Sequence, residues 1–72
     1  MDNTLGKRIR RARMWRGMGQ AELARAMGIS KTSLSLIETG QVKNPHYDIL
    51  QRIMQLLHVR ADFLFGLIDD PQ

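Results

Sequence analysis

Cysteine is absent from this 72-residue chain, and histidine is represented only by His46 and His58. Without cysteine, neither a disulfide nor a cysteine-based metal site can form. Two histidines that are far apart in the sequence do not make a metal site by themselves. We therefore expect no metal and no other cofactor, and one small domain held together by apolar packing.

Long apolar runs are also absent. The longest apolar-rich stretch is FLFGLI at residues 63–68, whereas a helix that spans a bilayer needs about 20 apolar residues. The arginines near the N-terminus are not followed by the apolar segment of a secretory signal. We therefore expect a soluble protein, located in the cytoplasm, with no membrane partner.

Acidic residues are scarce in the first part of the chain. Residues 1–31 contain eight Lys or Arg against two acids, and the chain has a net charge of +4. The stretch KRIRRARMWR at residues 7–16 contains six basic residues and no acid. Such a distribution indicates a polyanionic partner, although a basic run alone leaves open a solvated helix face.

Sustained alternation of polar and apolar residues, which is typical of strands, is missing as well. A 3.6-residue periodicity predicts an all-α fold, with helices at about residues 4–16, 20–27, 31–38, 46–57 and 61–66. The N-caps are expected at Asn3 or Thr4, at Gly19 and at Ser30, and Pro45 is expected at the first position of the fourth helix.

The five helices are expected to form a single domain over residues 1–72. Its folded core covers about residues 4–66, and residues 67–72 are a tail or the start of a linker.

The segment KTSLSLIE at residues 31–38 is unusually polar for a helix in the middle of a small domain. On a helical wheel, Leu34 and Ile37 define its buried side, and Ser33 and Glu38 lie at the flanks. The opposite side collects Lys31, Thr32, Ser35 and Leu36. This helix therefore has a narrow apolar anchor and a slim outward face that can donate and accept hydrogen bonds.

Two short helices separated by GIS at residues 28–30 fit a helix-turn-helix. Gly28 supplies the left-handed conformation that the turn needs, and Ile29 closes the corner. In such a motif the second helix enters the major groove of DNA, with its N-terminal residues at the base edges.

The exposed residues of the third helix suit this role. Lys31 would donate to guanine, Thr32 and Ser35 would contact bases or phosphates, and Leu36 would pack on a thymine methyl. The alternative is an ordinary solvated face, especially for Leu36, since single exposed leucines are common.

The stretch QAELARAMGISKTSLSLIETG at residues 20–40 resembles the helix-turn-helix of the phage repressor, Cro and XRE-like regulators. The shared pattern is a Gln, then Leu-Ala, then Gly, a small apolar residue and Ser or Thr, and finally an apolar residue, Ile, Glu and Gly. It is carried by Gln20, Leu23, Ala24, Gly28, Ile29, Ser30, Leu34, Ile37, Glu38 and Gly40. The similarity continues through Pro45 and Leu57 to Leu64, so it covers about residues 5–66.

The resemblance implies a compact five-helix, lambda-repressor-like DNA-binding domain. It places base reading within residues 31–36, and our candidates there are Lys31, Thr32, Ser33, Ser35 and Leu36.

Phosphate contacts and one structural ion pair are implied in the same way. The Gln that opens the motif clamps a phosphate in this family, which maps to Gln20, and the following loop offers Gln41, Lys43 and Asn44. A half-buried pair between Arg13 and Glu38 is also implied, and we interpret it as structural.

Two features depart from the family pattern. Gly19 stands where a capping Ser, Thr or Asn is common, so the second helix is expected to start loosely. The exposed face of the third helix lacks the Gln or Asn that often reads adenine. For this reason the resemblance transfers no target sequence.

The triplet HYD at residues 46–48 superficially resembles a cluster of catalytic groups. Adjacent residues at a helix start point in different directions, and no nucleophile with a base at helical spacing accompanies them. We expect no enzyme activity and no small-molecule ligand in this domain. His46 and Tyr47 are weaker candidates for phosphate contacts.

Several apolar residues exceed what the helix stripes require, namely Ile49, Leu56, Phe65, Leu67 and Ile68. They either complete the small core or form a dimer surface, for which Phe65, Leu67 and Ile68 are the candidates, and a dimer is also what the resemblance implies.

The prediction for function is a double-stranded DNA-binding transcriptional regulator, a repressor that binds an inverted-repeat operator as a homodimer. The alternative is an antitoxin-like or adaptor module that uses the same fold and its apolar C-terminal surface to bind a protein. A basic helix on a membrane surface is disfavoured, because the first helix lacks a wide, bulky apolar face.

Overall fold

The computed structural model describes residues 5–69, and this part of the chain contains five helices and no strand. They are α1 (Leu5–Trp15), α2 (Gln20–Met27), α3 (Lys31–Glu38), α4 (Tyr47–Leu57) and α5 (Ala61–Leu64). The all-α prediction is therefore confirmed. The expected caps at Asn3 or Thr4 and the last residues of the expected tail lie outside the described residues.

Two helix ends differ from the sequence prediction. Pro45 is not the first residue of α4, because His46 is extended and caps the helix, with its Nδ1 accepting a hydrogen bond from the Asp48 N–H at 3.2 Å. α5 ends at Leu64 rather than at residue 66. The N–H groups of Leu67 and Ile68 bind back to the Asp62 carbonyl, so the chain curls around instead of continuing the helix.

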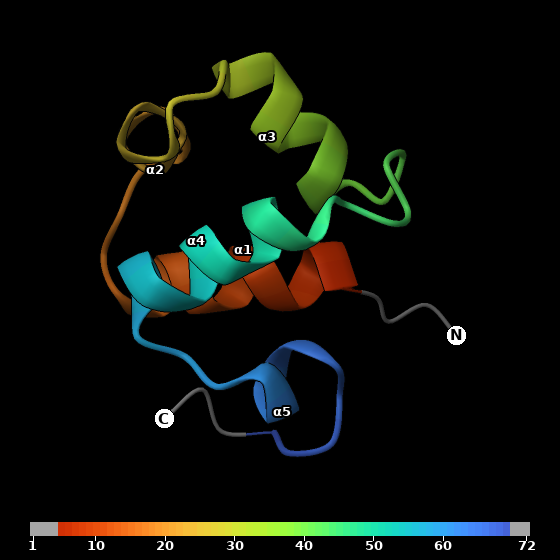
Figure 1. Cartoon of the computed structure of the whole chain (residues 1–72). Coiled ribbons are helices and arrows are strands. Elements are labelled where there is room, and N and C mark those ends of the chain that lie inside the picture. The colour runs from red at the N-terminus through yellow and green to blue at the C-terminus, as the bar shows by residue number, and fades with distance from the viewer. Residues whose placement is uncertain (1–4, 70–72) are drawn as a thin grey trace.

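The helices are arranged around α1 and α4, which lie across the middle of the molecule (Figure 1). α3 contacts α1 and α2, while α5 contacts α1. Seen as in Figure 1, α3 lies at the top of the molecule and α5 at the bottom. The outward face of α3 and the C-terminal segment are therefore on opposite sides.

Every helix contributes to one apolar core. Its largest fully buried side chains are Ile9, Leu23, Met27, Leu34, Ile53, Leu57, Phe63 and Leu64. Both expected anchors of α3, Leu34 and Ile37, are buried in it. α3 is thus fixed from beneath by apolar contacts, as the periodicity of residues 31–38 predicts.

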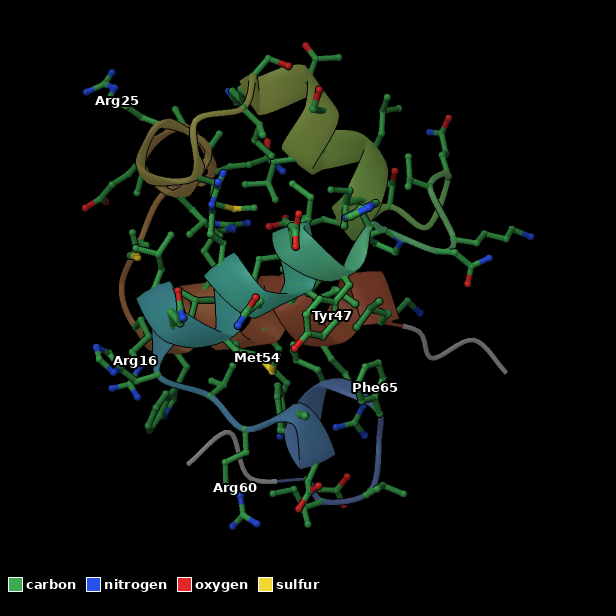
Figure 2. All side chains as sticks on the ribbon, in the orientation of Figure 1. Arg16, Arg25, Tyr47, Met54, Arg60 and Phe65 are labelled. Carbon is green, nitrogen blue, oxygen red and sulfur yellow. The ribbon has the colours of Figure 1, made fainter. Side chains whose placement is uncertain are left out.

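Three arginines of the basic run are used inside the molecule. Arg8 Nη1 donates to the carbonyls of Phe63 and Ile68, each at 3.0 Å. At the other end of α1, Arg16 donates to the last carbonyls of α4, at Leu57 and His58 (Figure 2). Arg13 is buried. Part of the positive charge of residues 7–16 is therefore used within the molecule, where it stabilises helix ends and loops.

None of the helices in the described part of the chain is both long and apolar enough to cross a bilayer.

Candidate nucleic-acid interface

The turn between α2 and α3 has helix-turn-helix geometry. Gly28 is left-handed, with φ 75° and ψ 26°, and its N–H binds the Arg25 carbonyl, so α2 closes at this residue. The Ile29 N–H binds the Ala24 carbonyl, and the Ile29 side chain packs on the core. The backbone therefore turns sharply while remaining hydrogen-bonded.

α3 begins at a well-formed cap. Ser30 is extended, and its Oγ accepts a hydrogen bond from the Ser33 N–H at 3.0 Å. The Ser30 hydroxyl also donates to Ser33 Oγ at 2.9 Å. Ser33 therefore keeps its own hydroxyl proton for another partner, but its position is fixed by the cap.

The outward face of α3 brings together the polar candidates at its N-terminal end. Lys31 and Thr32 are exposed, Ser35 is half-buried, and Leu36 keeps 37% of its surface exposed. The Lys31 side chain has no hydrogen bond or ion pair with any residue between 5 and 69. This face is narrow, polar at its start and apolar at Leu36.

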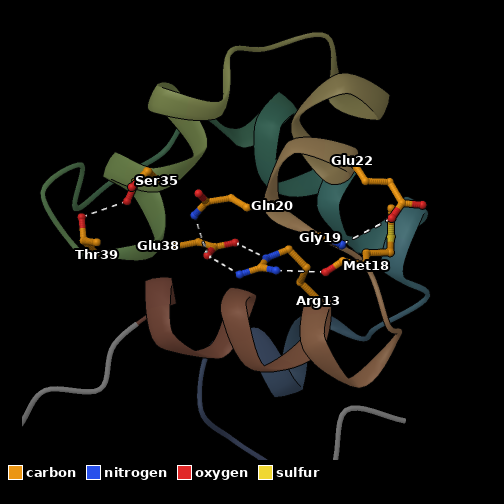
Figure 3. Close-up of polar contacts among 8 residues, drawn as sticks. All are labelled: Arg13, Met18, Gly19, Gln20, Glu22, Ser35, Glu38 and Thr39. Atoms are coloured by element: carbon orange, nitrogen blue, oxygen red, sulfur yellow. Dashed lines mark hydrogen bonds and ion pairs between the residues drawn. The ribbon is translucent and has the colours of Figure 1, made fainter.

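The other end of α3 is tied to α1 and α2 by a buried polar network (Figure 3). Arg13 Nε and Nη2 donate to the two carboxylate oxygens of Glu38, at 2.8 and 3.0 Å. Arg13 Nη1 also donates to the Met18 carbonyl at 2.9 Å, and Gln20 Nε2 donates to Glu38 Oε1 at 3.1 Å. The Arg13–Glu38 pair is buried rather than half-buried. The network around it includes Gln20, the expected phosphate ligand.

Gly19, the N-cap residue of α2, takes part in one side-chain hydrogen bond. The Gly19 N–H donates to Glu22 Oε1 at 3.3 Å, and glycine has no side chain with which to cap the helix in return. The Glu22 carboxylate therefore occupies the Gly19 N–H, a donor beside the expected phosphate ligand Gln20.

The loop between α3 and α4 exposes the remaining phosphate candidates. Gln41, Lys43 and Asn44 are all exposed, and Gln41 Nε2 makes a long 3.5 Å contact to Thr39 Oγ1. The loop that carries them follows α3 directly and lies beside this helix (Figure 1), so it adds exposed hydrogen-bond donors next to α3.

Comparison with known protein families identifies the arrangement of α2 and α3. A family model for the helix-turn-helix domain matches residues 4–62, which is most of the chain. The chain belongs to this helix-turn-helix domain family. The relatives below place it among the phage repressor and XRE-like members, and they confirm the lambda-repressor-like fold predicted from residues 20–40.

One similar protein is the HTH-type transcriptional regulator SinR of Bacillus licheniformis, 31% identical over 68 residues. The match covers 94% of this chain and 61% of that protein, so the chain spans about three fifths of the length of this relative.

Two solved structures resemble the domain closely. SinR in complex with DNA superposes with a TM-score of 0.80 at 32% identity, covering 86% of this chain and 98% of that one. The P22 c2 repressor in complex with a synthetic operator superposes with a TM-score of 0.77 at 27% identity, covering 88% of this chain and 94% of that one.

The helix-turn-helix domain also has an apolar hollow beside α3, which the sequence did not reveal. The hollow has a volume of about 270 Å³ and is lined by Ile29, Leu36, Val42, Pro45 and Ile49, among others. Val42 comes from the loop, and nothing in the spacing of the sequence relates it to Leu36.

Two further residues that position the motif were missed. Arg52 of α4 donates to the Met27 carbonyl at 2.8 Å and so holds the end of α2. Gly6 lies where α1 crosses the end of α3, and a Cβ at this position would collide with the carbonyl oxygens of Ile37 and Glu38. A glycine near a helix start gives no sequence signal for such close contact.

The apolar candidates for a dimer surface are not equivalent in the structure. Phe65 and Leu67 keep 59% and 75% of their surface exposed. Ile68 is half-buried against the core, as are Ile49 and Leu56. Ile49, Leu56 and Ile68 therefore complete the core. Phe65 and Leu67 remain available to a partner.

His46 and its neighbours form no site of their own. His46 caps α4, and its Nδ1 lies 3.7 Å from an Asp48 oxygen. Within residues 5–69, no cluster of three or more His, Cys, Asp or Glu is placed to hold a metal ion.

Proposed function

We propose that the chain is the DNA-binding domain of a transcriptional repressor that binds an inverted-repeat operator as a dimer. α3 enters the major groove of each half-site. The observation that carries this proposal is α3 itself, which is anchored by Leu34 and Ile37 and presents Lys31, Thr32 and Leu36 outward. Two similar structures, of SinR and of the P22 c2 repressor, contain DNA, which supports the same role.

The proposal divides the contacts into two kinds. Lys31, Thr32, Ser33, Ser35 and Leu36 read base edges. Gln20, Gln41, Lys43 and Asn44 contact phosphates, which fix the register of the protein but carry no sequence information. Affinity then depends strongly on salt, because each neutralised phosphate releases counterions.

Selection from a pool of random-sequence duplex DNA, followed by footprinting on the selected site, tests this function. We expect two inverted half-sites whose centres lie about 34 Å apart on one face of the duplex. A protein that selects no sequence and binds DNA weakly even at low salt would contradict the proposal.

A protein-interaction module of the antitoxin or adaptor type is the second candidate. The strong exposure of the apolar residues Phe65 and Leu67 favours it, and the segment that follows α5 lies on the other side of α1 and α4 from α3 (Figure 1). Failure to bind duplex DNA, combined with loss of a partner protein in a Leu67→Ser variant, would favour this module instead.

A further inference from the structure

Gln20 is not a free side chain at the start of α2, because its amide is held by Glu38. Its Nε2 donates to Glu38 Oε1 at 3.1 Å, and this is its one hydrogen bond to residues 5–69 (Figure 3). A carboxylate only accepts hydrogen bonds, so the nitrogen of the amide has to face Glu38. The opposite orientation would set two acceptors against each other. Glu38 therefore selects one of the two orientations of the Gln20 amide.

Glu38 is itself fixed and neutralised. Its side chain is 2% exposed, and Arg13 binds both of its carboxylate oxygens, at 2.8 and 3.0 Å. Arg13 is anchored in turn by the Met18 carbonyl at 2.9 Å. Without Arg13, a buried negative charge would lie one hydrogen bond away from the side chain expected to meet a phosphate. The bidentate pair removes that repulsion and fixes the acceptor in place.

We propose that Arg13 and Glu38 are positioning residues for DNA binding, which hold Gln20 so that its second Nε2 proton is presented to a backbone phosphate. The inference rests on the proposed function, in which Gln20 contacts DNA. In this inference the Arg13–Glu38 pair not only stabilises the fold but also orients Gln20. One Nε2 proton stays on Glu38, and the other is donated to the phosphate, so Gln20 does not have to change its conformation on binding.

A set of four proteins tests this inference by non-additivity. They are the wild type, Gln20→Ala, the charge-free Arg13→Met/Glu38→Met variant, and the triple variant. Removing both partners leaves no unpaired buried charge, and such replacements are often tolerated. Dissociation constants are measured on the selected duplex by fluorescence anisotropy, at a temperature where circular dichroism finds all four proteins folded.

We expect Gln20→Ala to weaken binding about tenfold, as for the loss of one hydrogen bond to a charged group. The charge-free variant should lose a similar factor, and the triple variant should bind no worse than either. If the two losses multiply in the triple variant, or if the charge-free variant binds like the wild type, the inference is overturned. A wild type that binds no duplex overturns the proposed function as well.

The wild-type protein provides a second test, which keeps the Arg13–Glu38 pair intact and needs only the Gln20→Ala variant for assignment. In nitrogen–proton spectra, the two Nε2 protons of Gln20 are assigned from the signals that disappear in Gln20→Ala. On addition of the selected duplex, one proton should shift strongly while the proton bonded to Glu38 keeps its position. Loss of the Glu38-bonded signal on DNA binding would mean that Gln20 leaves Glu38, which contradicts the positioning role.

Discussion

Individual side chains on α3 and on the following loop occupy different positions, and this separates their expected effects on DNA binding. Lys31 is the one cation on α3 and lies at its first turn, which is the part of the helix expected to reach base edges in the proposed complex. Lys43 lies on the exposed loop beyond the helix. The charge of Lys31 is therefore expected to contribute to sequence preference, whereas the charge of Lys43 is expected to meet phosphates only.

Lys31→Ala is expected to cost about 1–3 kcal/mol on the selected site and to relax preference at one base pair. Lys43→Ala should weaken binding to selected and random duplexes by the same factor and lower the salt dependence by about one counterion. Titrations of both variants on both duplexes at several salt concentrations measure this difference. Equal losses on both duplexes for both variants would contradict the division.

Leu36 is half exposed at the rim of the apolar hollow that it forms with Ile29 and Val42. The hollow offers an apolar environment for a thymine methyl group, and the methyl contributes about 0.8 kcal/mol when it is buried. Replacing one thymine of the selected site by uracil, which lacks only this methyl, should therefore weaken binding a few-fold.

The same uracil substitution should have no further effect on a Leu36→Ala variant, because the apolar contact is already lost. A uracil scan of every thymine in the selected site, with both proteins, provides the measurement. If no thymine responds, or if both proteins respond equally, Leu36 does not read a methyl group.

At the scale of the helices, the crossing of α1 and α3 depends on the absence of a side chain at Gly6. A Cβ there would lie closer than van der Waals contact to the Ile37 and Glu38 carbonyl oxygens. These belong to the last turn of α3, which also carries Glu38 and its buried network. The close approach of the two helices therefore brings Arg13 within reach of Glu38.

Gly6→Ala is expected to lower the free energy of unfolding by about 1–3 kcal/mol, since the backbones must separate. The gain in helix propensity, about 0.5–1 kcal/mol, offsets only part of this loss. Urea unfolding measures the change, and Arg10→Ala at an exposed position of α1 is the control, expected within about 0.5 kcal/mol of the wild type. A stabilised Gly6→Ala protein would mean that the crossing is not crowded.

The sequence predicts the helices well, because apolar periodicity determines them. It predicts the contacts of long side chains and of loops less well. Leu34, Ile37 and Gly28 follow from local pattern and turn chemistry. Arg8 and Arg16 look identical to solvated basic residues, because the carbonyls that they bind lie at least 41 residues away in the chain. The contact between Val42 and Leu36 is missed for a different reason: the two residues are close in the chain, but the loop conformation that brings them together gives no periodic signal.

At the scale of the whole molecule, residues 5–69 present two separate surfaces, an arrangement that would allow the proposed binding of DNA and of a second copy at the same time. α3 and its loop lie on one side, and the C-terminal segment with Phe65 and Leu67 lies on the other side of α1 and α4. Arg8 fixes that segment to α1 through the Phe63 and Ile68 carbonyls and an ion pair with Asp69 at 3.2 Å. The exposed apolar residues are thus held on an ordered backbone.

If this surface pairs two copies on the operator, Phe65→Ser/Leu67→Ser should weaken binding to the complete site by at least about tenfold while the affinity for a single half-site stays unchanged. The physical reason is that the variant keeps every DNA contact but loses the link that makes the second half-site intramolecular. Gel-shift titrations on complete and half sites measure both affinities. Met14→Ser is the control, because Met14 is also an exposed apolar residue but lies on α1. Equal weakening on both duplexes would mean that Phe65 and Leu67 stabilise the fold of the monomer instead. No weakening on either duplex would exclude them from the dimer contact.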